Sequence, residues 1–102
     1  MSADPKPVGV PLPKAPCADT ATQCRALGLQ VGDTIEGRES AGNHYWHEAR
    51  LTLLWLGQSV AVWSVTERSS PRCIEWSAPE ENADWTLECR RWFKLPTTPQ
   101  PD

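Results

Sequence analysis

The sequence lacks the features that most directly announce a function. No apolar run approaches the ~20 residues that span a bilayer, and the proline-rich start has no basic segment followed by an apolar one, as a secretion signal would. We therefore expect a chain that makes no membrane contact and resides in the cytoplasm. No G-x-S-x-G, P-loop or H-E-x-x-H sequence is present, so we expect no catalytic residues and a protein that is not an enzyme.

Cysteine and histidine are few and poorly spaced for a metal site. The chain has four cysteines and two histidines, but no C-x-x-C pair, and the spacing of Cys17 and Cys24 is too long for a usual zinc knuckle. Nothing indicates secretion, so we interpret the cysteines as thiols, with Cys89 as a small buried residue. We predict no metal ion and no cofactor.

The charge is mildly acidic, while tryptophan is abundant. A net charge of −3 argues against a general binder of duplex DNA, because phosphate neutralisation dominates that affinity. The chain has six tryptophans, all from Trp46 to Trp92, against one phenylalanine and one tyrosine. Each indole can bury roughly 150–250 Å². Tryptophan therefore supplies much of the core of a small domain and is also a candidate for its binding surface.

Proline divides the chain into three parts. Eight of the ten prolines lie outside the centre, which predicts a flexible, polyproline-like arm over residues 1–16 and a tail over residues 96–102. Residues 17–95 are predicted to form one small domain. A short helix is expected at residues 19–27, with Asp19 or Thr20 as its N-cap and Gly28 as a left-handed stop.

Alternation of apolar and polar residues predicts about five strands, at residues 34–39, 45–56, 59–68, 73–77 and 85–95. Gly57-Gln58 is expected to form a two-residue type II′ hairpin turn, and residues 79–84 an acidic loop. The fold class is mainly β: a small bent antiparallel sheet or an SH3-like barrel, with one short N-terminal helix. A barrel would remove most free strand edges.

The same alternation separates the tryptophans. We expect three indoles to fill the interior and two to project from polar faces beside cations. The interior set is Trp55, Trp63 and Trp85, and the predicted binding residues are Trp46, Arg50, Arg90, Trp92 and Lys94. Three interpretations stay open at this point: stacking on a nucleotide or single-stranded nucleic acid, anchoring a protein partner, or a cation–π cover with no ligand.

Three stretches, GDTIEGRE, YWHEARLTLLWLGQSVAVW and ADWTLECRRWFKL, resemble a group of small tryptophan-rich proteins of unknown function encoded by bacteriophages and prophages. They span roughly residues 29–95. The resemblance transfers no catalytic or binding residue. It implies a small phage accessory protein in the cytoplasm of a host bacterium, for which host takeover or inhibition of host immunity is a common role.

These observations together predict a non-enzymatic phage accessory protein that binds and inhibits a host factor, such as an antiviral defence component. One alternative is a module that binds nucleotides or single-stranded nucleic acid and sequesters a signal. Another is a structural or assembly protein of the virion. A host protein is the expected partner, and assembly into a homo-oligomer stays open.

Overall fold

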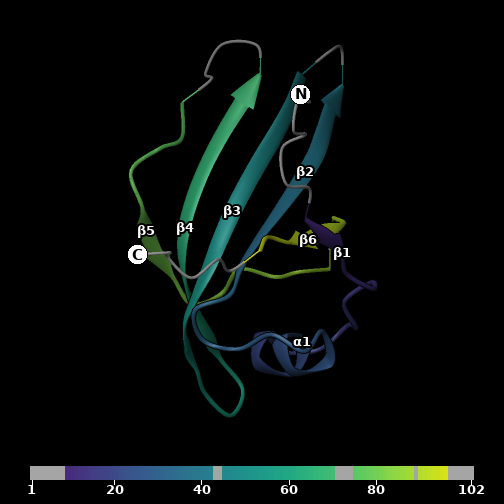
Figure 1. The fold of residues 1–102 in the computed structure, drawn as a ribbon, viewed down its shortest axis with the longest axis vertical. Helices are drawn as coiled ribbons and strands as arrows, with labels where there is room; N and C mark the ends of the chain where they lie inside the picture. The colour runs from purple at the N-terminus through teal and green to yellow at the C-terminus, as the bar shows by residue number, and fades with distance from the viewer. Residues whose placement is uncertain (1–8, 43–44, 71–74, 89, 97–102) are drawn as a thin grey trace, which may run out of the picture.

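In the computed structural model, the protein forms one antiparallel sheet of six strands with a short helix against one face (Figure 1). Residues 9–42, 45–70, 75–88 and 90–96 are described. The strand order is β1-β6-β2-β3-β4-β5, so β1 and β5 are the two edges. The predicted mainly β fold and bent sheet are confirmed, whereas the predicted SH3-like barrel is wrong because the sheet does not close.

The three long strands β2, β3 and β4 are consecutive in the chain and form the body of the sheet. The predicted bounds of β3 are confirmed, β2 extends three residues beyond its predicted end, and β4 begins and ends two residues later than predicted. The elements are β1 (Val10–Pro11), α1 (Thr20–Ala26), β2 (Thr34–Gly42), β3 (Tyr45–Leu56), β4 (Ala61–Ser70), β5 (Glu80–Asn82) and β6 (Trp92–Lys94).

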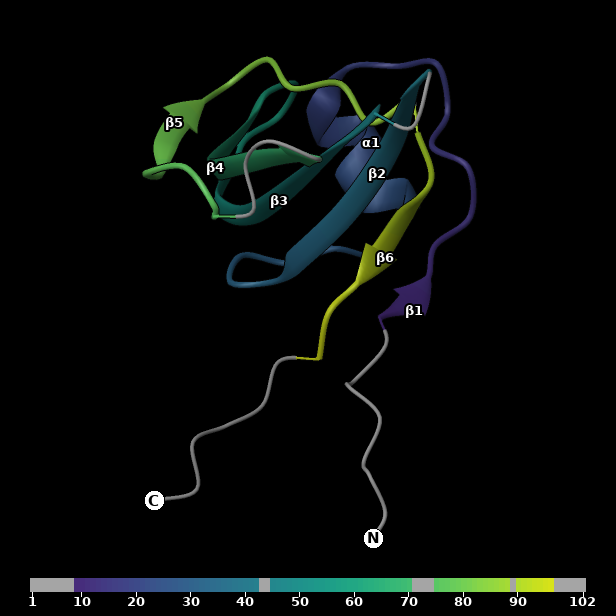
Figure 2. The ribbon, with the colours of Figure 1, turned by 90° about the horizontal axis from the view of Figure 1, so that it is seen from above.

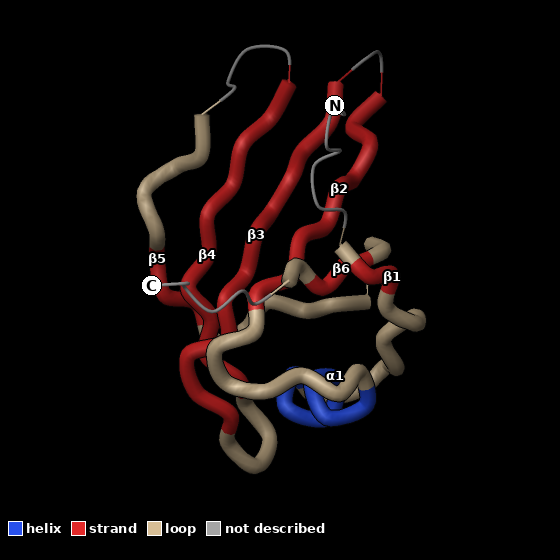
Figure 3. The backbone as a smooth tube through the Cα atoms, viewed as in Figure 1, coloured by secondary structure: helices blue, strands red, loops and turns tan. Residues whose placement is uncertain are grey.

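Helix α1 begins and ends as its sequence predicts. The Asp19 side chain accepts the backbone N–H of Thr22 at 2.8 Å, and Gly28 follows the helix with φ of 73°. The helix lies across the lower end of the sheet (Figure 3). Its buried Gln23 side chain accepts the backbone N–H of Leu87 at 3.1 Å, which ties the helix to the C-terminal part of the chain.

The sheet has two different faces. Figure 2 shows α1 on one side of the sheet. The odd-numbered residues of β2, of β3 up to Leu53 and of β4 include the buried apolar side chains, and we call the side that they cover the core face. Even-numbered residues point the opposite way, onto what we call the open face. The buried apolar side chains of the core face are Ile35, Ala49, Leu51, Leu53, Ala61, Trp63 and Val65, joined by Cys24, Leu27, Leu29, Leu87 and Trp92 from other segments.

The predicted final strand over residues 85–95 is wrong along most of its described length, because Trp92–Lys94 is the only described part of this range that pairs as a strand. Side chains satisfy the backbone of Leu87 instead. Its N–H donates a hydrogen bond to the Gln23 side chain, and its carbonyl accepts one from the indole Nε1 of Trp92 at 3.1 Å. Trp92 is 2% exposed. The prediction that Trp92 projects from the surface is therefore wrong.

A bulge in β3 changes the position of Trp55. Leu53 pairs with Trp63, but Trp55 pairs with Val62, so Leu54 is an extra residue. A bulge shifts the alternation of side chains, and Leu54 and Trp55 are 42% and 56% exposed. The prediction that Trp55 fills the interior is wrong. Trp63 is fully buried as predicted, and the half-buried Trp85 packs against the core.

The connection after β3 also differs from the prediction. It spans residues 57–60 and is closed by a hydrogen bond from the N–H of Gly57 to the carbonyl of Val60 at 2.8 Å. Gly57 does not have the positive φ that a type II′ turn requires. A Cβ at Gly57 would overlap the Trp55 ring. Glycine is needed here because the indole lies close to the backbone.

Both sheet edges bear features that oppose further strand pairing. Strand β1 lies within the predicted proline-rich arm, and its Pro11 has no N–H to donate. Strand β5 lies where an acidic loop was predicted, and Glu80 and Glu81 are exposed there. Such features protect an open sheet from edge-to-edge association, so closure into a barrel is not required.

Several predictions concern residues outside those described. Residues 1–8 of the predicted arm, Cys89 and residues 97–102 of the predicted tail lie outside. The predicted strand at residues 73–77 falls partly outside, and its described residues 75–77 are not in a strand.

We predict that Gly37→Ala lowers the free energy of unfolding by about 1–3 kcal/mol. A Cβ at this core-face glycine would lie 2.8 Å from both Trp92 Cε3 and Arg90 Cδ. Urea denaturation followed by tryptophan fluorescence measures the change. Gln58→Ala, at an exposed position, is the control and is expected within about 0.5 kcal/mol of wild type. An unchanged stability of Gly37→Ala would contradict the packing of Trp92 on β2.

Candidate functional site

The open face presents charged and aromatic side chains in rows that cross β2, β3 and β4. Each row consists of residues that lie directly opposite one another in the sheet register. Opposite charges that face each other across strands stabilise a sheet, and the charges alternate in sign both along and across the first two rows. The rows are Arg38, Glu48 and Arg68; Glu36, Arg50 and Thr66; and Thr34, Thr52 and Ser64.

Glu48 holds the first row together. Its Oε2 accepts hydrogen bonds from Arg38 Nε at 3.1 Å and Nη2 at 2.8 Å, and its Oε1 accepts one from Arg68 Nε at 2.6 Å. The Glu48 side chain is only 4% exposed. Burial alone would raise its pKa, but the hydrogen bonds and charges of the two arginines outweigh burial and hold the pKa below its ordinary value. The ionised carboxylate therefore fixes both guanidinium groups.

Two indoles stack on the arginines of this face. The guanidinium carbon of Arg38 lies 4.7 Å from the ring centroid of Trp46. Those of Arg50 and Arg68 lie 4.4 Å and 4.5 Å from the ring centroid of Trp76. These distances are within the range of cation–π attraction. Both indoles are half-buried, so part of each remains accessible to a ligand.

Trp76 reaches the open face from a segment that is not a strand. The neighbouring Ser77 donates its backbone N–H to the carbonyl of Glu67 at 2.9 Å, and its hydroxyl accepts the N–H of Glu67 at 3.0 Å. This pair of bonds holds the segment beside β4. The Trp76 indole is thereby placed over two arginines of the sheet.

The second row is less completely bonded than the first. Glu36 Oε1 and Arg50 Nη2 are 3.6 Å apart, which is an ion pair but too long for a hydrogen bond. Arg50 Nε is buried and has no hydrogen-bond partner among the described residues. Most buried polar atoms in folded proteins have a partner. Among the described residues, the partly exposed Glu36 carboxylate therefore keeps acceptors that have no hydrogen-bond donor.

A hollow of about 410 Å³ adjoins these rows where β2 meets β6. The register pairs Glu36 with Phe93, which places the ring beside the carboxylate on the same face. One side of the hollow is apolar and the other is charged. Its lining residues are Gly9, Glu36, Gly37, Arg38, Glu48, Phe93 and Leu95.

The five predicted binding residues do not form one surface. Trp46 and Arg50 lie on the open face as expected, although Arg38 rather than Arg50 stacks on Trp46. Trp92 is buried on the core face. The predicted surface centred on Trp92, Arg90 and Trp46 is therefore wrong.

Arg90 and Lys94 lie apart from Trp46 and are held by other residues. Arg90 Nη2 is 2.8 Å from a carboxylate oxygen of Glu39, and its guanidinium carbon is 5.6 Å from the ring centroid of Trp92. Lys94 Nζ is 3.3 Å from Asp33 Oδ2. These contacts attach the C-terminal segment to β2 and to the turn before it.

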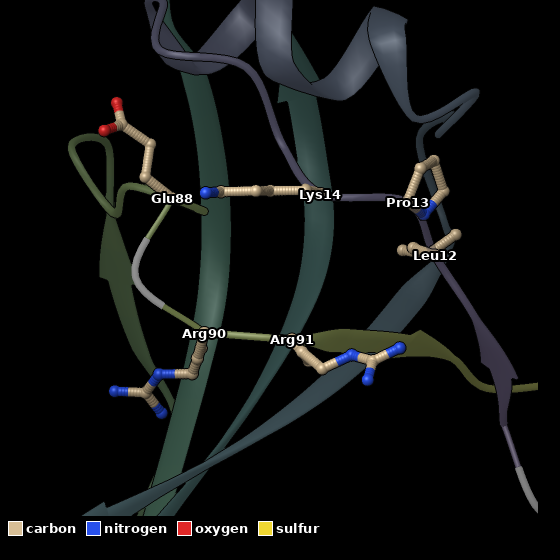
Figure 4. A pocket seen from close by; sticks show the side chains of 6 residues that line it. All are labelled: Leu12, Pro13, Lys14, Glu88, Arg90 and Arg91. Atoms are coloured by element: carbon tan, nitrogen blue, oxygen red, sulfur yellow. The ribbon is translucent and has the colours of Figure 1, made fainter.

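A second hollow, of about 480 Å³, lies between residues 12–14 on one side and Glu88, Arg90 and Arg91 on the other. It is lined partly by Lys14, Arg90 and Arg91. Figure 4 shows Lys14 extending toward the segment of Glu88, while the guanidinium groups of Arg90 and Arg91 point away from Lys14. Because the three cations do not converge, this hollow lacks the geometry of an anion site.

Among the described residues there is neither a cluster of metal ligands nor a membrane-spanning helix. No three histidine, cysteine, aspartate or glutamate side chains among them gather as ligands for a metal ion. No described helix is long and apolar enough to cross a membrane. Cys17 is exposed and Cys24 is buried, and both are free. Burial raises the pKa of the Cys24 thiol to about 11, which keeps it protonated and unreactive.

No known protein family, curated protein or solved structure matches this chain. The fold and the open face define it as a small mainly β protein with an ordered surface of tryptophan, arginine and glutamate.

We predict that Glu48→Gln lowers the free energy of unfolding at neutral pH by about 2–3 kcal/mol, because two arginines lose their common carboxylate. The pKa of Glu48 is lower in the folded chain than in the unfolded chain. The stabilisation is therefore complete above its ordinary pKa of 4.5 and is lost as the pH falls through the folded-state pKa. The difference in free energy of unfolding between Glu48→Gln and wild type should therefore shrink over that acidic range.

Urea unfolding at a series of pH values measures this difference. Glu81→Gln, at an exposed position on β5, is the matched control and should leave the stability nearly unchanged. If the free energies of unfolding of Glu48→Gln and wild type still differ by the same amount at acidic pH, the proposed charge pairing is contradicted.

Proposed function

We propose that this chain is a non-enzymatic binding protein whose open face contacts another protein. The observation that supports this most directly is the stacking of Trp46 and Trp76 on arginines, two of which are held by Glu48. Tryptophan and arginine are enriched among the residues that dominate protein–protein affinity. Side chains that are already held in place lose little conformational freedom when a partner binds.

The charge balance of this face favours a protein over a nucleic acid. The ion pairs of this face contain three arginines and two glutamates, so their net charge is only +1. The residues are Arg38, Arg50, Arg68, Glu36 and Glu48. Nucleic-acid affinity depends on cations that neutralise phosphates. Two of these arginines already donate hydrogen bonds to Glu48. Nucleotide or single-stranded nucleic-acid binding is thus the second candidate, supported by the indole–arginine pairs alone.

The proposed biological role is that of a phage accessory protein that blocks a host factor, such as an antiviral defence component, in the cytoplasm of a bacterium. This part of the proposal is supported by the sequence resemblance to small phage and prophage proteins. A virion structural or assembly role is the alternative from the same source, and cofractionation with virus particles distinguishes it.

We predict that Trp76→Ala reduces capture of the protein partner from a bacterial host lysate by more than about tenfold, since an interface hot spot contributes at least ~2 kcal/mol. The immobilised chain is incubated with lysate, and bound proteins are quantified by mass spectrometry. Trp55→Ala is the comparison variant, because Trp55 is an exposed tryptophan at the far end of β3, beyond the rows of arginine and glutamate in the sheet register.

Circular dichroism should show the same fold for both variants. Full capture by Trp76→Ala would overturn the proposed surface. If instead single-stranded DNA quenches the tryptophan fluorescence of wild type but not of Trp76→Ala, and more weakly at high salt, the nucleic-acid candidate replaces the protein partner.

A further inference from the structure

We propose that the hollow between β2 and β6 receives a lysine or arginine side chain of the bound protein, with Glu36 as the residue that pairs with its charge. This inference rests on the proposed function and specifies the chemistry of the partner at the same face. It follows from which polar groups of the hollow are already bonded, from the nature of its walls and from the charge around it.

Glu36 is the lining carboxylate with unused acceptors. Both oxygens of Glu48 accept hydrogen bonds from arginines, and Arg38 is occupied by that same carboxylate. Among the residues that the structure describes, Glu36 has only the 3.6 Å contact with Arg50, and no hydrogen bond joins the two. A donor that enters the hollow can therefore bond to Glu36 without breaking an existing hydrogen bond.

The walls fit the stem of a long basic side chain. Phe93 and Leu95 supply apolar surface, and Gly9 adds no side chain. Lysine and arginine place an apolar stem along such a surface while the charged head reaches a polar group. The ring of Phe93 next to Glu36 also favours a cation.

Other occupants fit this hollow less well. A neutral apolar side chain would bury the Glu36 carboxylate without giving it a hydrogen-bond donor, which is costly. An acidic side chain would be repelled by the same carboxylate. The chain also has a net charge of −3, and the exposed Glu80, Glu81 and Asp84 lie along the β5 side. Glu80, Glu81 and Asp84 lie at the edge of the sheet opposite the hollow, so this charge attracts a basic partner to the molecule only at long range, and Glu36 supplies the local pairing.

Model compounds test the inference without the partner. N-acetyl-arginine amide and N-acetyl-lysine amide are titrated to about 50 mM, a range that detects millimolar affinity, while two-dimensional ¹H–¹⁵N NMR spectra are recorded. We expect saturable shifts of the backbone amides of Gly37, Phe93 and Leu95. N-acetyl-norleucine amide, which has an apolar stem but no charge, and N-acetyl-glutamate amide should produce no saturable shifts there.

Glu36→Gln is the decisive variant, and we expect it to weaken binding of the arginine and lysine amides by more than about fivefold. Glu81→Gln, which removes the same charge from the exposed β5, should bind them like wild type. Equal binding by Glu36→Gln, equal binding of the norleucine amide, or no saturable shifts at these residues would overturn the inference.

The two proposals fail separately. Trp76→Ala should retain binding of the arginine amide while it loses capture of the partner protein. If the arginine and lysine amides do not bind in the hollow but capture of the partner protein still depends on Trp76, the proposed function stands. If the amides bind but capture of the partner protein does not depend on Trp76, the proposed surface is refuted. The hollow then remains a site for basic side chains.

Discussion

The open face depends on one buried carboxylate. Glu48 accepts three hydrogen bonds from Arg38 and Arg68, one arginine on each neighbouring strand. Without those donors, an ionised carboxylate at this depth would be strongly unfavourable. Without the carboxylate, the two guanidinium groups would lose the bonds that hold them under the indoles of Trp46 and Trp76. One ion cluster thus joins the stability of the central strands to the shape of the surface.

The candidate site was partly visible in the sequence. Alternation along β3 correctly placed Trp46 and Arg50 on one polar face, because a strand with regular pairing keeps its side-chain period. Arg38 was missed because its contact with Trp46 depends on the register of two strands, which one strand's pattern does not reveal. Trp76 was missed for a different reason: it lies in a segment with no strand and reaches the sheet through the Ser77–Glu67 bonds.

The fold was predictable where backbone groups form hydrogen bonds with neighbouring strands. It was less predictable where the backbone groups form hydrogen bonds with side chains instead. The class, the helix caps and the bounds of β3 followed from local pattern and capping chemistry. The segment before β6 did not, because Gln23 and Trp92 bond the backbone of Leu87. Two signals pointed to this difference: Arg91 interrupted the alternation, and Gly37 in the middle of a strand marked a close approach of another group.

The bond between Gln23 and Leu87 joins residues 64 positions apart, and β1 pairs with β6 across a still longer span of chain. Contacts this distant form late in folding, because closing a long loop costs entropy before the contact contributes. The hairpins of β2, β3 and β4 involve near neighbours and can assemble while the polypeptide is still being synthesised. The helix then acquires its full set of contacts only after the final strand has left the ribosome, so that enclosure of the interior is among the last events of its biogenesis.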